Sequence, residues 1–352
     1  MNEELTVVVP THNRPAFLNR LLTYLSSASL QSPLLIVDSS DHERLETNRQ
    51  TIERFGESLQ IVHRVDRAGL IRKCRYAMDK VQTPYTVFCA DDDFLFTESA
   101  TACVNFLRDH DDYAAAMGSW VWLNSAKNSR CHQSKCRSID HADPLQRFRS
   151  LATRWFSTFY AVHRTDYLRD AWESADESSE YDQARVYPEL MLGQIGMLAG
   201  KLKVLPVLHM IFQLHDDNEH RRLPLVQDPA VQQALYRRFA DELGRLMTKS
   251  ASCTIDQATE ILDELYGPTG EKMLRDNGRT VGLHRVRRNL WNQIQLLRDR
   301  ISSDQTNIWI RRRLSANHPS CQTQAWKRAF DLAVEFPNGM TPSTGSSDRA
   351  AA

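Results

Sequence analysis

The sequence lacks an excess of charge of either sign. Lysine plus arginine and aspartate plus glutamate each number 44 among the 352 residues, so the formal net charge at pH 7 is +0. A large positive balance would point to nucleic acid or to an anionic membrane surface as the partner. Without such an excess, composition gives no reason to expect either partner, and any electrostatic recognition by this chain must be local.

Long apolar runs and a regular cysteine pattern are also missing. No stretch approaches the roughly 18 consecutive apolar residues that a membrane-spanning helix needs. The opening MNEELTVVVP is acidic and only briefly apolar, which matches neither a secretory signal nor a transit peptide. The seven cysteines are odd in number and scattered, which is typical of reduced thiols. We therefore expect a cytoplasmic protein.

Short β-rich segments alternate with helical periodicity in the first hundred residues. The segments LTVVVP, PLLIVD, LQIVHRV and YTVFCA each predict a strand. Apolar residues at helical spacing fill the intervals, as in RPAFLNRLLTYLSS. This alternation predicts an α/β fold with an open, mostly parallel sheet and helices on both faces. Beyond about residue 222 the spacing is helical, which predicts a separate, mainly helical C-terminal region.

Polar side chains follow the end of each predicted strand. Thr11 and Arg14 follow the first, Asp38 ends the second, Arg67 follows the third, and residues 91–93 are three consecutive aspartates after the fourth. In such sheets, ligands bind at the carboxyl ends of the strands. Adjacent carboxylates repel, and a hard divalent cation shared with phosphate oxygens would make them tolerable. The pattern favours a metal-held nucleotide diphosphate; in the alternative, one aspartate caps the next helix and the others face solvent.

Four segments carry a resemblance to a known family. The segments TVVVPTHNRPAFLNRLL, LLIVDSSD, GLIRKCRYAMDKV and PYTVFCADDDFLFTES resemble, in order and spacing, the motifs of family 2-type glycosyltransferases with the GT-A fold. The resemblance covers about residues 6–98, weakens over 124–143 and returns faintly between 155 and 215. It implies a GT-A catalytic domain over residues 1–222 that binds a nucleotide-sugar.

The resemblance also implies roles for the residues at the strand ends. Thr11 and Arg14 would contact the nucleotide, and Asp38 would hold its uracil or ribose. Asp91 and Asp93 would form the DxD pair that binds Mg²⁺ or Mn²⁺ against the diphosphate. A second alignment, to the LDADD segment of many family members, places Ala90 at the first aspartate of that segment and residues 92–93 at the last two.

Basic residues and a late histidine complete the expected donor site. Asp92 and Arg67 are further candidates for the nucleotide-sugar site. The helix GLIRKCRYAMDKV departs from the family pattern, so Arg72, Lys73 or Arg75 could face the phosphates, or all three could form a solvated basic face. His215 follows an apolar run, VLHMIFQL, and the resemblance implies that it completes the metal site, where neutral imidazole suits Mn²⁺.

The second half of the catalytic domain must supply the acceptor side. In the family, an acidic residue at the start of a helix before a G-x-K/R-x-x-x-x-P pattern is the catalytic base. Glu189 is the best match because Gly200, Lys203 and Pro206 echo this context, although the family's usual Glu-Asp pair is reduced to one acid here; Asp182 is the reserve candidate. The alternative is that Glu189 only stabilises the helix N-terminus, which contributes under about 1 kcal/mol.

The implied activity is inverting, metal-dependent transfer of a sugar from a nucleoside-diphosphate sugar to a hydroxyl on a glycan or lipid-linked acceptor, in surface or extracellular polysaccharide biosynthesis. Two other readings stay open. A sugar-nucleotide nucleotidyltransferase uses a similar sheet, but normally has a glycine-rich loop after the first strand, and PTHNRPAFL has no glycine. A non-catalytic GT-A-like protein would bind the nucleotide-sugar without a base.

The C-terminal part separates into two predicted regions. Residues 223–335 form the mainly helical region, which is basic between residues 281 and 328 and contains three tryptophans, Trp291, Trp309 and Trp326. Basic and aromatic side chains together suit a polyanionic acceptor or the inner face of a membrane, with peripheral attachment. An oligomer contact or a solvated helical face are the alternatives. Residues 336–352 are predicted to be a disordered tail.

Overall fold

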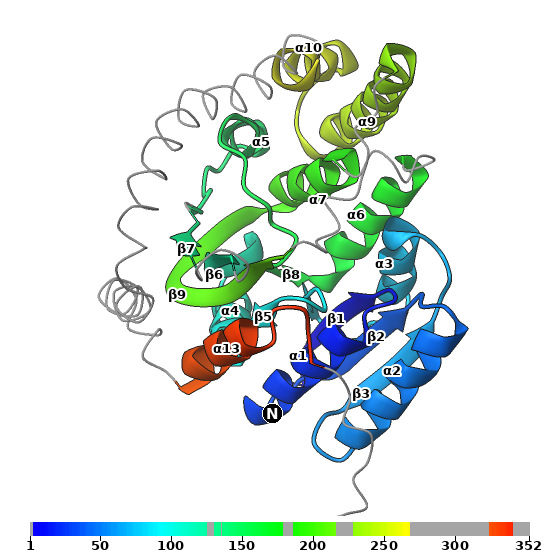
Figure 1. Cartoon of the computed structure of the whole chain (residues 1–352). Helices are drawn as coiled ribbons and strands as arrows, with labels where there is room; N and C mark the ends of the chain where they lie inside the picture. The colour runs from blue at the N-terminus through cyan, green and yellow to red at the C-terminus, as the bar shows by residue number, and fades with distance from the viewer. Residues whose placement is uncertain are drawn as a thin grey trace, which may run out of the picture.

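A single mixed β-sheet forms the centre of the molecule (Figure 1). The computed structural model describes residues 3–124, 130–134, 136–178, 186–215, 228–267 and 324–340. In spatial order the strands of the path are β3 (Ile61–Val65), β2 (Leu34–Asp38), β1 (Leu5–Thr11), β4 (Tyr85–Phe88), β8 (Val162–Arg164), β6 (Tyr113–Asn124), β9 (Lys201–Leu214) and β5 (Phe94–Leu95). A further strand, β7 (Arg130–Gln133), pairs with β6.

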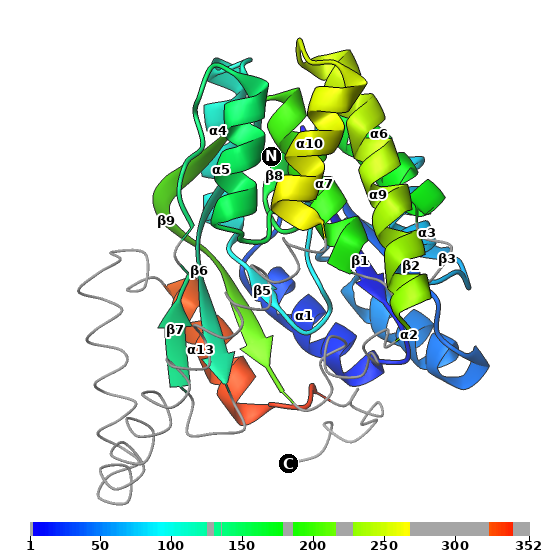
Figure 2. The same ribbon diagram turned by 90° about the horizontal axis from the view of Figure 1, so that it is seen from above.

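The first four strands are parallel, which confirms the sequence prediction for this half. Strand β1 lies between β2 and β4, and all three run in the same direction. The later strands pair in both orientations. Strand β8 is antiparallel to both β4 and β6, whereas β6 and β9 are parallel and run side by side over a long stretch (Figure 2). The order places the carboxyl end of β1 between the ends of its two neighbours, where ligands bind in such folds.

Two apolar cores form on opposite faces of the sheet because successive strand residues point to opposite sides. In β1, Val7 and Val9 pack into one core and Val8 into the other, so the run VVV is fully buried. The first core is covered by α1 (Pro15–Ser27), α2 (His42–Phe55), α4 (Thr97–Asp109) and α13 (Gln324–Glu335). The second is covered by α3 (Leu70–Met78), α6 (Thr165–Ser178), α7 (Val186–Ala199), α9 (Pro229–Ser250) and α10 (Ile255–Tyr266).

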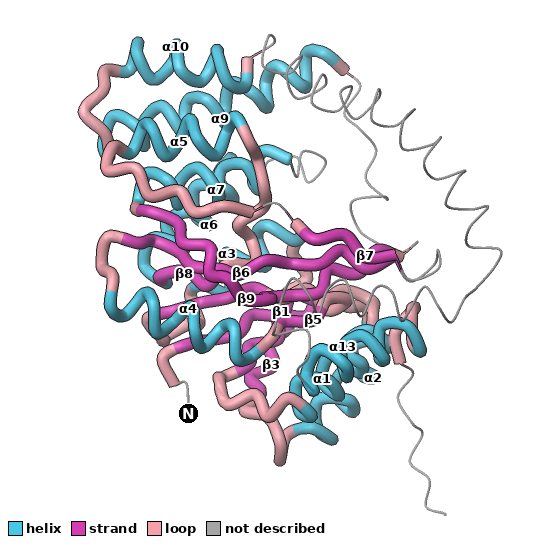
Figure 3. The backbone as a smooth tube through the Cα atoms, turned by 90° about the vertical axis from the view of Figure 1, so that its left-hand side faces the viewer, coloured by secondary structure: helices cyan, strands magenta, loops and turns pink. Residues whose placement is uncertain are grey.

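Figure 3 shows this layering, with α1, α2 and α13 on one side of the sheet and α7, α9 and α10 on the other. Helix α5 (Pro144–Thr153) packs beside α7 and contributes one side chain to each core, Phe148 and Leu151. An α/β sheet with helices on both faces is therefore confirmed. Among the described residues, no helix is both long and apolar enough to cross a membrane.

The C-terminal part is helical where it is described, and its helices lie in different places. Helices α9 and α10 pack against each other and α9 against α7, whereas α13 lies beside α1 on the opposite face (Figures 1 and 3). The boundary predicted near residue 222 lies outside the described residues. Residues 336–340, at the start of the predicted disordered tail, hydrogen-bond to the backbone and side chains of α1, and the rest of that tail lies outside the described residues.

Candidate active site

The carboxyl ends of β1 and β4 meet at a buried hydroxyl–carboxylate contact. Thr11 is the last residue of β1, and its Oγ1 donates a hydrogen bond of 2.7 Å to Oδ2 of Asp91, three residues after β4. Both side chains are buried. Since β1 and β4 are parallel neighbours, the sheet itself brings together two residues that lie 80 positions apart in sequence.

Arg14 adds a cation to this contact. It precedes α1, and Pro15 starts the helix with the fixed φ angle that a first turn requires. One guanidinium nitrogen, Nη1, donates to Asp91 Oδ1 at 3.2 Å and to Asp92 Oδ2 at 2.9 Å, with 12% of the Arg14 side chain exposed. Arg14 therefore bridges two adjacent carboxylates at the edge of the sheet.

His215 reaches the same carboxylate from the far end of β9. Its Nε2 lies 2.9 Å from Asp92 Oδ2, and its ring stacks on Phe17 of α1 with 4.6 Å between ring centroids. Two positions before it, the backbone N–H of Gln213 donates to Asp93 Oδ1 at 2.9 Å. The structure thus brings together six residues predicted from the sequence, namely Thr11, Arg14, Asp91, Asp92, Asp93 and His215.

The three aspartates, which we call the acidic turn, differ in their electrostatics. Burial and repulsion from Asp92 raise the pKa of Asp91 to about 6, although Arg14 and Thr11 act in the opposite direction. Burial also acts to raise the pKa of Asp92, but the hydrogen bond with His215 and the charge of Arg14 outweigh it and lower that pKa. Burial and the charge of Asp92 raise the pKa of Asp93 well above its usual range. Two of the three carboxylates of the acidic turn therefore have raised pKa values even though Arg14 lies against the turn.

The donor groups of the acidic turn suit a hard divalent cation. Carboxylate oxygens are the usual ligands of Mg²⁺, and an imidazole nitrogen such as that of His215 is also compatible with Mn²⁺. A cation would relieve the repulsion that raises the pKa values of Asp91 and Asp93. Within the described residues, however, no three His, Cys, Asp or Glu side chains already form a cation cage. The residues fit by type and charge, and Arg14 lies between two of the carboxylates.

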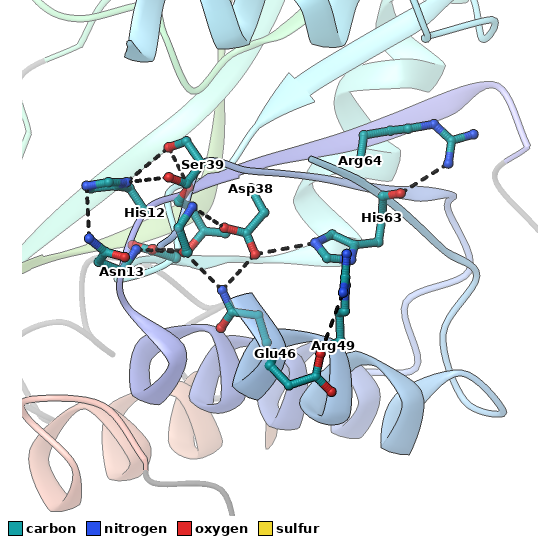
Figure 4. A network of polar contacts seen from close by, with 12 residues as sticks. His12, Asn13, Asp38, Ser39, Glu46, Arg49, His63 and Arg64 are labelled. Atoms are coloured by element: carbon teal, nitrogen blue, oxygen red, sulfur yellow. Dashed lines mark hydrogen bonds and ion pairs between the residues drawn. The ribbon is translucent and has the colours of Figure 1, made fainter. Parts of the chain in front are cut away.

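Asp38 lies at the centre of a separate polar network at the end of β2 (Figure 4). Its Oδ1 accepts from the backbone N–H of Ser40 at 2.8 Å, and its Oδ2 accepts from Asn48 Nδ2 at 2.8 Å and lies 3.3 Å from His63 Nε2. Burial acts to raise the pKa of Asp38, but these hydrogen bonds outweigh it and lower the pKa. The Asp38 carboxylate is fully buried, and its contact with a nucleotide stays a prediction.

The loops after β1 and β2 are hydrogen-bonded to each other beside Asp38. Asn13 has φ 57°, a left-handed conformation that asparagine adopts more readily than most residues. Its side chain exchanges two hydrogen bonds of 2.8 Å with Asp41, and its backbone N–H donates to Ser40 Oγ at 2.7 Å. His12, next to it, lies 2.9 Å from the carbonyl of Ser39 (Figure 4). These contacts, which sequence reasoning missed, hold the two loops together at the carboxyl ends of β1 and β2.

The basic residues of α3 divide between two sides of the helix. Lys73 is buried, and its Nζ donates to the carbonyl of Thr11 at 2.8 Å and to Ser39 Oγ at 2.9 Å. Arg72 and Arg75 instead reach Asp176 of α6, at 3.5 and 3.9 Å. Of the three alternatives left by the sequence, Lys73 is the one at the strand ends. The predicted phosphate roles of Arg72 and Arg75 stay untested.

Two further predicted residues lie apart from the acidic turn. Arg67 is exposed in the segment after β3. Glu189 is exposed in the first turn of α7, which begins at Val186. Its reserve, Asp182, lies outside the described residues. Their predicted roles stay predictions.

Comparisons with known proteins agree with this geometry. Residues 6–172 match the sequence model described as Glycosyl transferase family 2. No curated protein sequence matches the chain. A crystal structure of S. aureus TarS 1–349 in complex with UDP is similar, with 15% identity, a TM-score of 0.53, and coverage of 95% of this chain and 91% of that one. TarS 1–349 in complex with UDP-GlcNAc has 15% identity, a TM-score of 0.51, and coverage of 74% and 71%.

The fold and the match together define the class of protein: the chain is a glycosyltransferase with a GT-A fold. The match to the Glycosyl transferase family 2 model is carried by residues 6–172. The matched range contains the ends of β1, β2 and β4, and therefore the acidic turn, Arg14 and Asp38.

Proposed function

We propose that the chain transfers a sugar from a nucleoside-diphosphate sugar to a hydroxyl acceptor, with inversion at the anomeric carbon and with Mg²⁺ or Mn²⁺. The observation that carries this proposal is the convergence of Thr11, Arg14 and His215 on the acidic turn. Two segments of the chain, the β1–α1 connection and the end of β9, supply a hydroxyl, a guanidinium and an imidazole to adjacent carboxylates at the position where α/β folds bind nucleotides.

The choice of donor is supported by the similar structures. TarS 1–349 is described in complex with UDP and with UDP-GlcNAc. In this chain, Lys73 and Arg14 are two cations at the end of β1, and either would be able to pair with phosphate oxygens. Asp38 and the residues that hold it would form the wall for the nucleoside. The donor is therefore proposed as a nucleoside-diphosphate sugar, with UDP as the first nucleotide to test.

Asp91, Asp93 and His215 would hold the divalent cation, with Asp92 beside them. When bound, the cation neutralises charge on the departing diphosphate. Arg14 contacts Asp91 and Asp92 and would pair with phosphate oxygens of the bound donor. Thr11 orients Asp91 through its 2.7 Å hydrogen bond. The protein side chains thus position both carboxylates and phosphates before the transfer step.

Glu189 is the proposed catalytic base, which would accept the proton of the acceptor hydroxyl. In Glu189→Gln, a side chain of similar size cannot accept that proton, so we expect kcat to fall about 100-fold or more with little change in the donor KM. Glu98→Gln is a matched control, because Glu98 is also an exposed glutamate in the first turn of a helix, α4. A Glu189→Gln protein that is less stable but has a normal kcat would show that Glu189 only stabilises the N-terminus of α7. Asp182 would then be the next candidate for the catalytic base.

The acceptor side is proposed from the sequence alone. A glycan or lipid-linked acceptor and a peripheral contact with an inner membrane face would both use the basic segment 281–328. Apart from residues 324–328, this segment lies outside the described residues. Binding of the chain to vesicles with and without anionic lipid tests the membrane contact, since an electrostatic attachment weakens as salt rises.

One experiment tests the donor proposal. Thermal shift and calorimetric titration are carried out with UDP, GDP and their sugar conjugates, each with and without MnCl₂. A nucleotide that binds only the folded state raises the Tm. We expect a Tm increase that requires both nucleotide and Mn²⁺, and slow release of nucleoside diphosphate from the matching sugar donor. Binding that is unchanged by removal of the metal would contradict the metal-dependent form of the proposal.

A further inference from the structure

A C-terminal segment far from the family motifs lies against the first helix. Residues 336–340, which we call the strap, follow α13 directly. The backbone N–H of Met340 donates to the carbonyl of Ala16 at 2.7 Å, and Asn19 Nδ2 donates to the carbonyl of Met340 at 2.9 Å. The strap is therefore joined to the first turns of α1, next to Arg14.

Gly339 allows the strap to approach α1 this closely. Its φ is +86°, in the left-handed region that side-chain-bearing residues rarely adopt. A Cβ atom at this position would lie 2.5 Å from the carbonyl carbon of Ala16 and 2.5 Å from the nitrogen of Phe17. Both atoms belong to the backbone, which cannot move aside at low cost. Docking of the strap thus depends on the absence of a side chain at residue 339.

Arg20 connects the strap to the acidic turn. One nitrogen of its guanidinium, Nη1, donates to the carbonyl of Phe336 at 2.7 Å, and the other, Nη2, donates to the carbonyl of Asp92 at 2.8 Å. The group is fully buried between the rings of Phe17 and Phe94, at 5.0 and 4.8 Å from their centroids. Burial lowers the pKa of Arg20 to about 10, while the aspartates raise it, so the guanidinium is charged at neutral pH.

Gln213 makes a second, independent connection. Its backbone N–H donates to Asp93 Oδ1 at 2.9 Å, and its side-chain Nε2 donates to the carbonyls of Ala333 at 3.3 Å and Pro337 at 3.0 Å. Gln213 is fully buried. The acidic turn is thus held through two residues: Arg20 also donates to a carbonyl of the strap, and Gln213 also donates to carbonyls of α13 and the strap.

We propose that the strap is a working part of the nucleotide site, and that Arg20 and Gln213 are positioning residues that couple its docking to the placement of the acidic turn. The inference rests on the proposed function, because it assigns the acidic turn to the metal and diphosphate. Neither residue touches the reacting groups. Coupling of this kind is reciprocal, so nucleotide binding must stabilise the docked strap as much as the docked strap favours nucleotide binding.

The test uses full-length Gly339→Ala, with Gly56→Ala as its control. Gly56 ends α2 with φ −60°, and a Cβ there would lie 3.4 Å from the carbonyl oxygen of Glu53, so alanine is accommodated. Affinities for UDP, GDP and Mn²⁺ alone are measured well below the Tm of each variant. We expect Gly339→Ala to raise the nucleotide Kd in the presence of Mn²⁺ about tenfold (~1.4 kcal/mol) and Gly56→Ala to leave it unchanged.

Gln213→Met provides a second variant that does not depend on Gly339. It removes the side-chain hydrogen bonds to α13 and the strap but keeps the backbone N–H that holds Asp93. We expect a similar tenfold rise in the nucleotide Kd, with kcat at saturating donor less affected than KM. If Gly339→Ala does not fold, Gln213→Met decides the question.

Hydrogen exchange supplies a readout that a purely structural role would not change. UDP with Mn²⁺ should slow exchange of the Gly339 and Met340 amides, which donate to Phe336 and Ala16. Nucleotide affinity within twofold of wild type in a variant whose strap amides exchange faster would overturn the inference. If wild type binds neither nucleotide nor Mn²⁺, the proposed function fails together with it. If wild type binds nucleotide and Mn²⁺ and the strap variants bind them with the same affinity, only the inference about the strap fails.

Discussion

Asp38 and Asp91 both belong to the carboxyl ends of buried parallel strands, and their pKa values shift in opposite directions. Asp38 is surrounded by three donors, from Ser40, Asn48 and His63, which outweigh burial and lower its pKa. Asp91 has Thr11 and Arg14 as donors, but burial and its neighbour Asp92 dominate and raise its pKa to about 6. The chain therefore contains one carboxylate site that is complete within the protein and one that is not.

The difference indicates which region is scaffold and which region binds a ligand. A fully hydrogen-bonded buried carboxylate holds the surrounding loops in place, as Asp38 does for the loop after β2. A buried cluster of like charges costs stability and is retained when a bound partner supplies the missing charge. On this comparison, we propose the acidic turn as the metal and diphosphate site and Asp38 as a residue that supports it.

The largest effect is expected from Asp91→Asn. If Asp91 binds the metal, this change should weaken Mn²⁺-dependent nucleotide binding about 100-fold or more, because even residues outside the immediate ligand set often cost 10–100-fold. Calorimetric titration with UDP and Mn²⁺ measures this. Affinity close to that of wild type would remove Asp91 from the site and favour the register in which residues 92–93 bind the metal.

Asp38→Asn should instead act on stability. The substitution removes the negative charge that accepts hydrogen bonds from three donors, and it places an amide NH₂ group against one or more of those donors. We therefore expect a loss of about 2 kcal/mol in the free energy of unfolding. Chemical denaturation measures the loss, and Ser39→Ala is a control from the same loop. A stable Asp38→Asn protein with a large loss of nucleotide affinity would reverse the comparison and make Asp38 a direct ligand-binding residue.

Asp91→Asn, without nucleotide or metal, should behave in the opposite way to Asp38→Asn. Removal of a buried charge next to Asp92 relieves repulsion, and we expect the free energy of unfolding at pH 7 to rise by about 1 kcal/mol. The same denaturation experiment measures it. A destabilised Asp91→Asn would mean that the contacts with Thr11 and Arg14 outweigh the repulsion.

The pH dependence of the free energy of unfolding should also differ between Asp91→Asn and Asp38→Asn, although this effect is smaller. A raised pKa favours the folded state at low pH, so the stability advantage of Asp91→Asn over wild type should shrink as pH falls from about 6 towards 4. A lowered pKa has the opposite sign, so the deficit of Asp38→Asn should persist across that window and shrink only below pH ~4, near the usual aspartate pKa. Parallel curves for both variants would contradict the assignment of opposite shifts.

Much of the nucleotide half could be predicted from the sequence because its signals are local. The run VVV, buried on both faces, and the polar residues that end each strand locate Thr11, Asp38 and the acidic turn. Lys73 could also have been found, because it lies among apolar positions of α3 such as Ile71, Cys74 and Ala77, whereas Arg72 and Arg75 lie elsewhere on the helix. The basic character of the helix alone did not separate these residues.

The rest depends on contacts between distant parts of the chain. Arg20 looks like one more polar residue in an amphipathic helix, and its partner Phe336 lies 316 positions away. The pairing of β9 with β6, which brings His215 to Asp92, is likewise non-local. The strap was predicted to be part of a disordered tail, whose later residues are polar and glycine-containing, and the sequence gives no sign that Gly339 has φ +86° and lies against the backbone of α1.

The most direct test of the central claim is a crystal structure with UDP and Mn²⁺, in which anomalous scattering locates the metal. The account predicts one Mn²⁺ bound by carboxylate oxygens of the acidic turn and by phosphate oxygens of UDP, with Asp38 still hydrogen-bonded to Ser40 and Asn48. A diphosphate bound elsewhere on the chain, or held at the acidic turn by Arg14 and Lys73 with no metal, would contradict it.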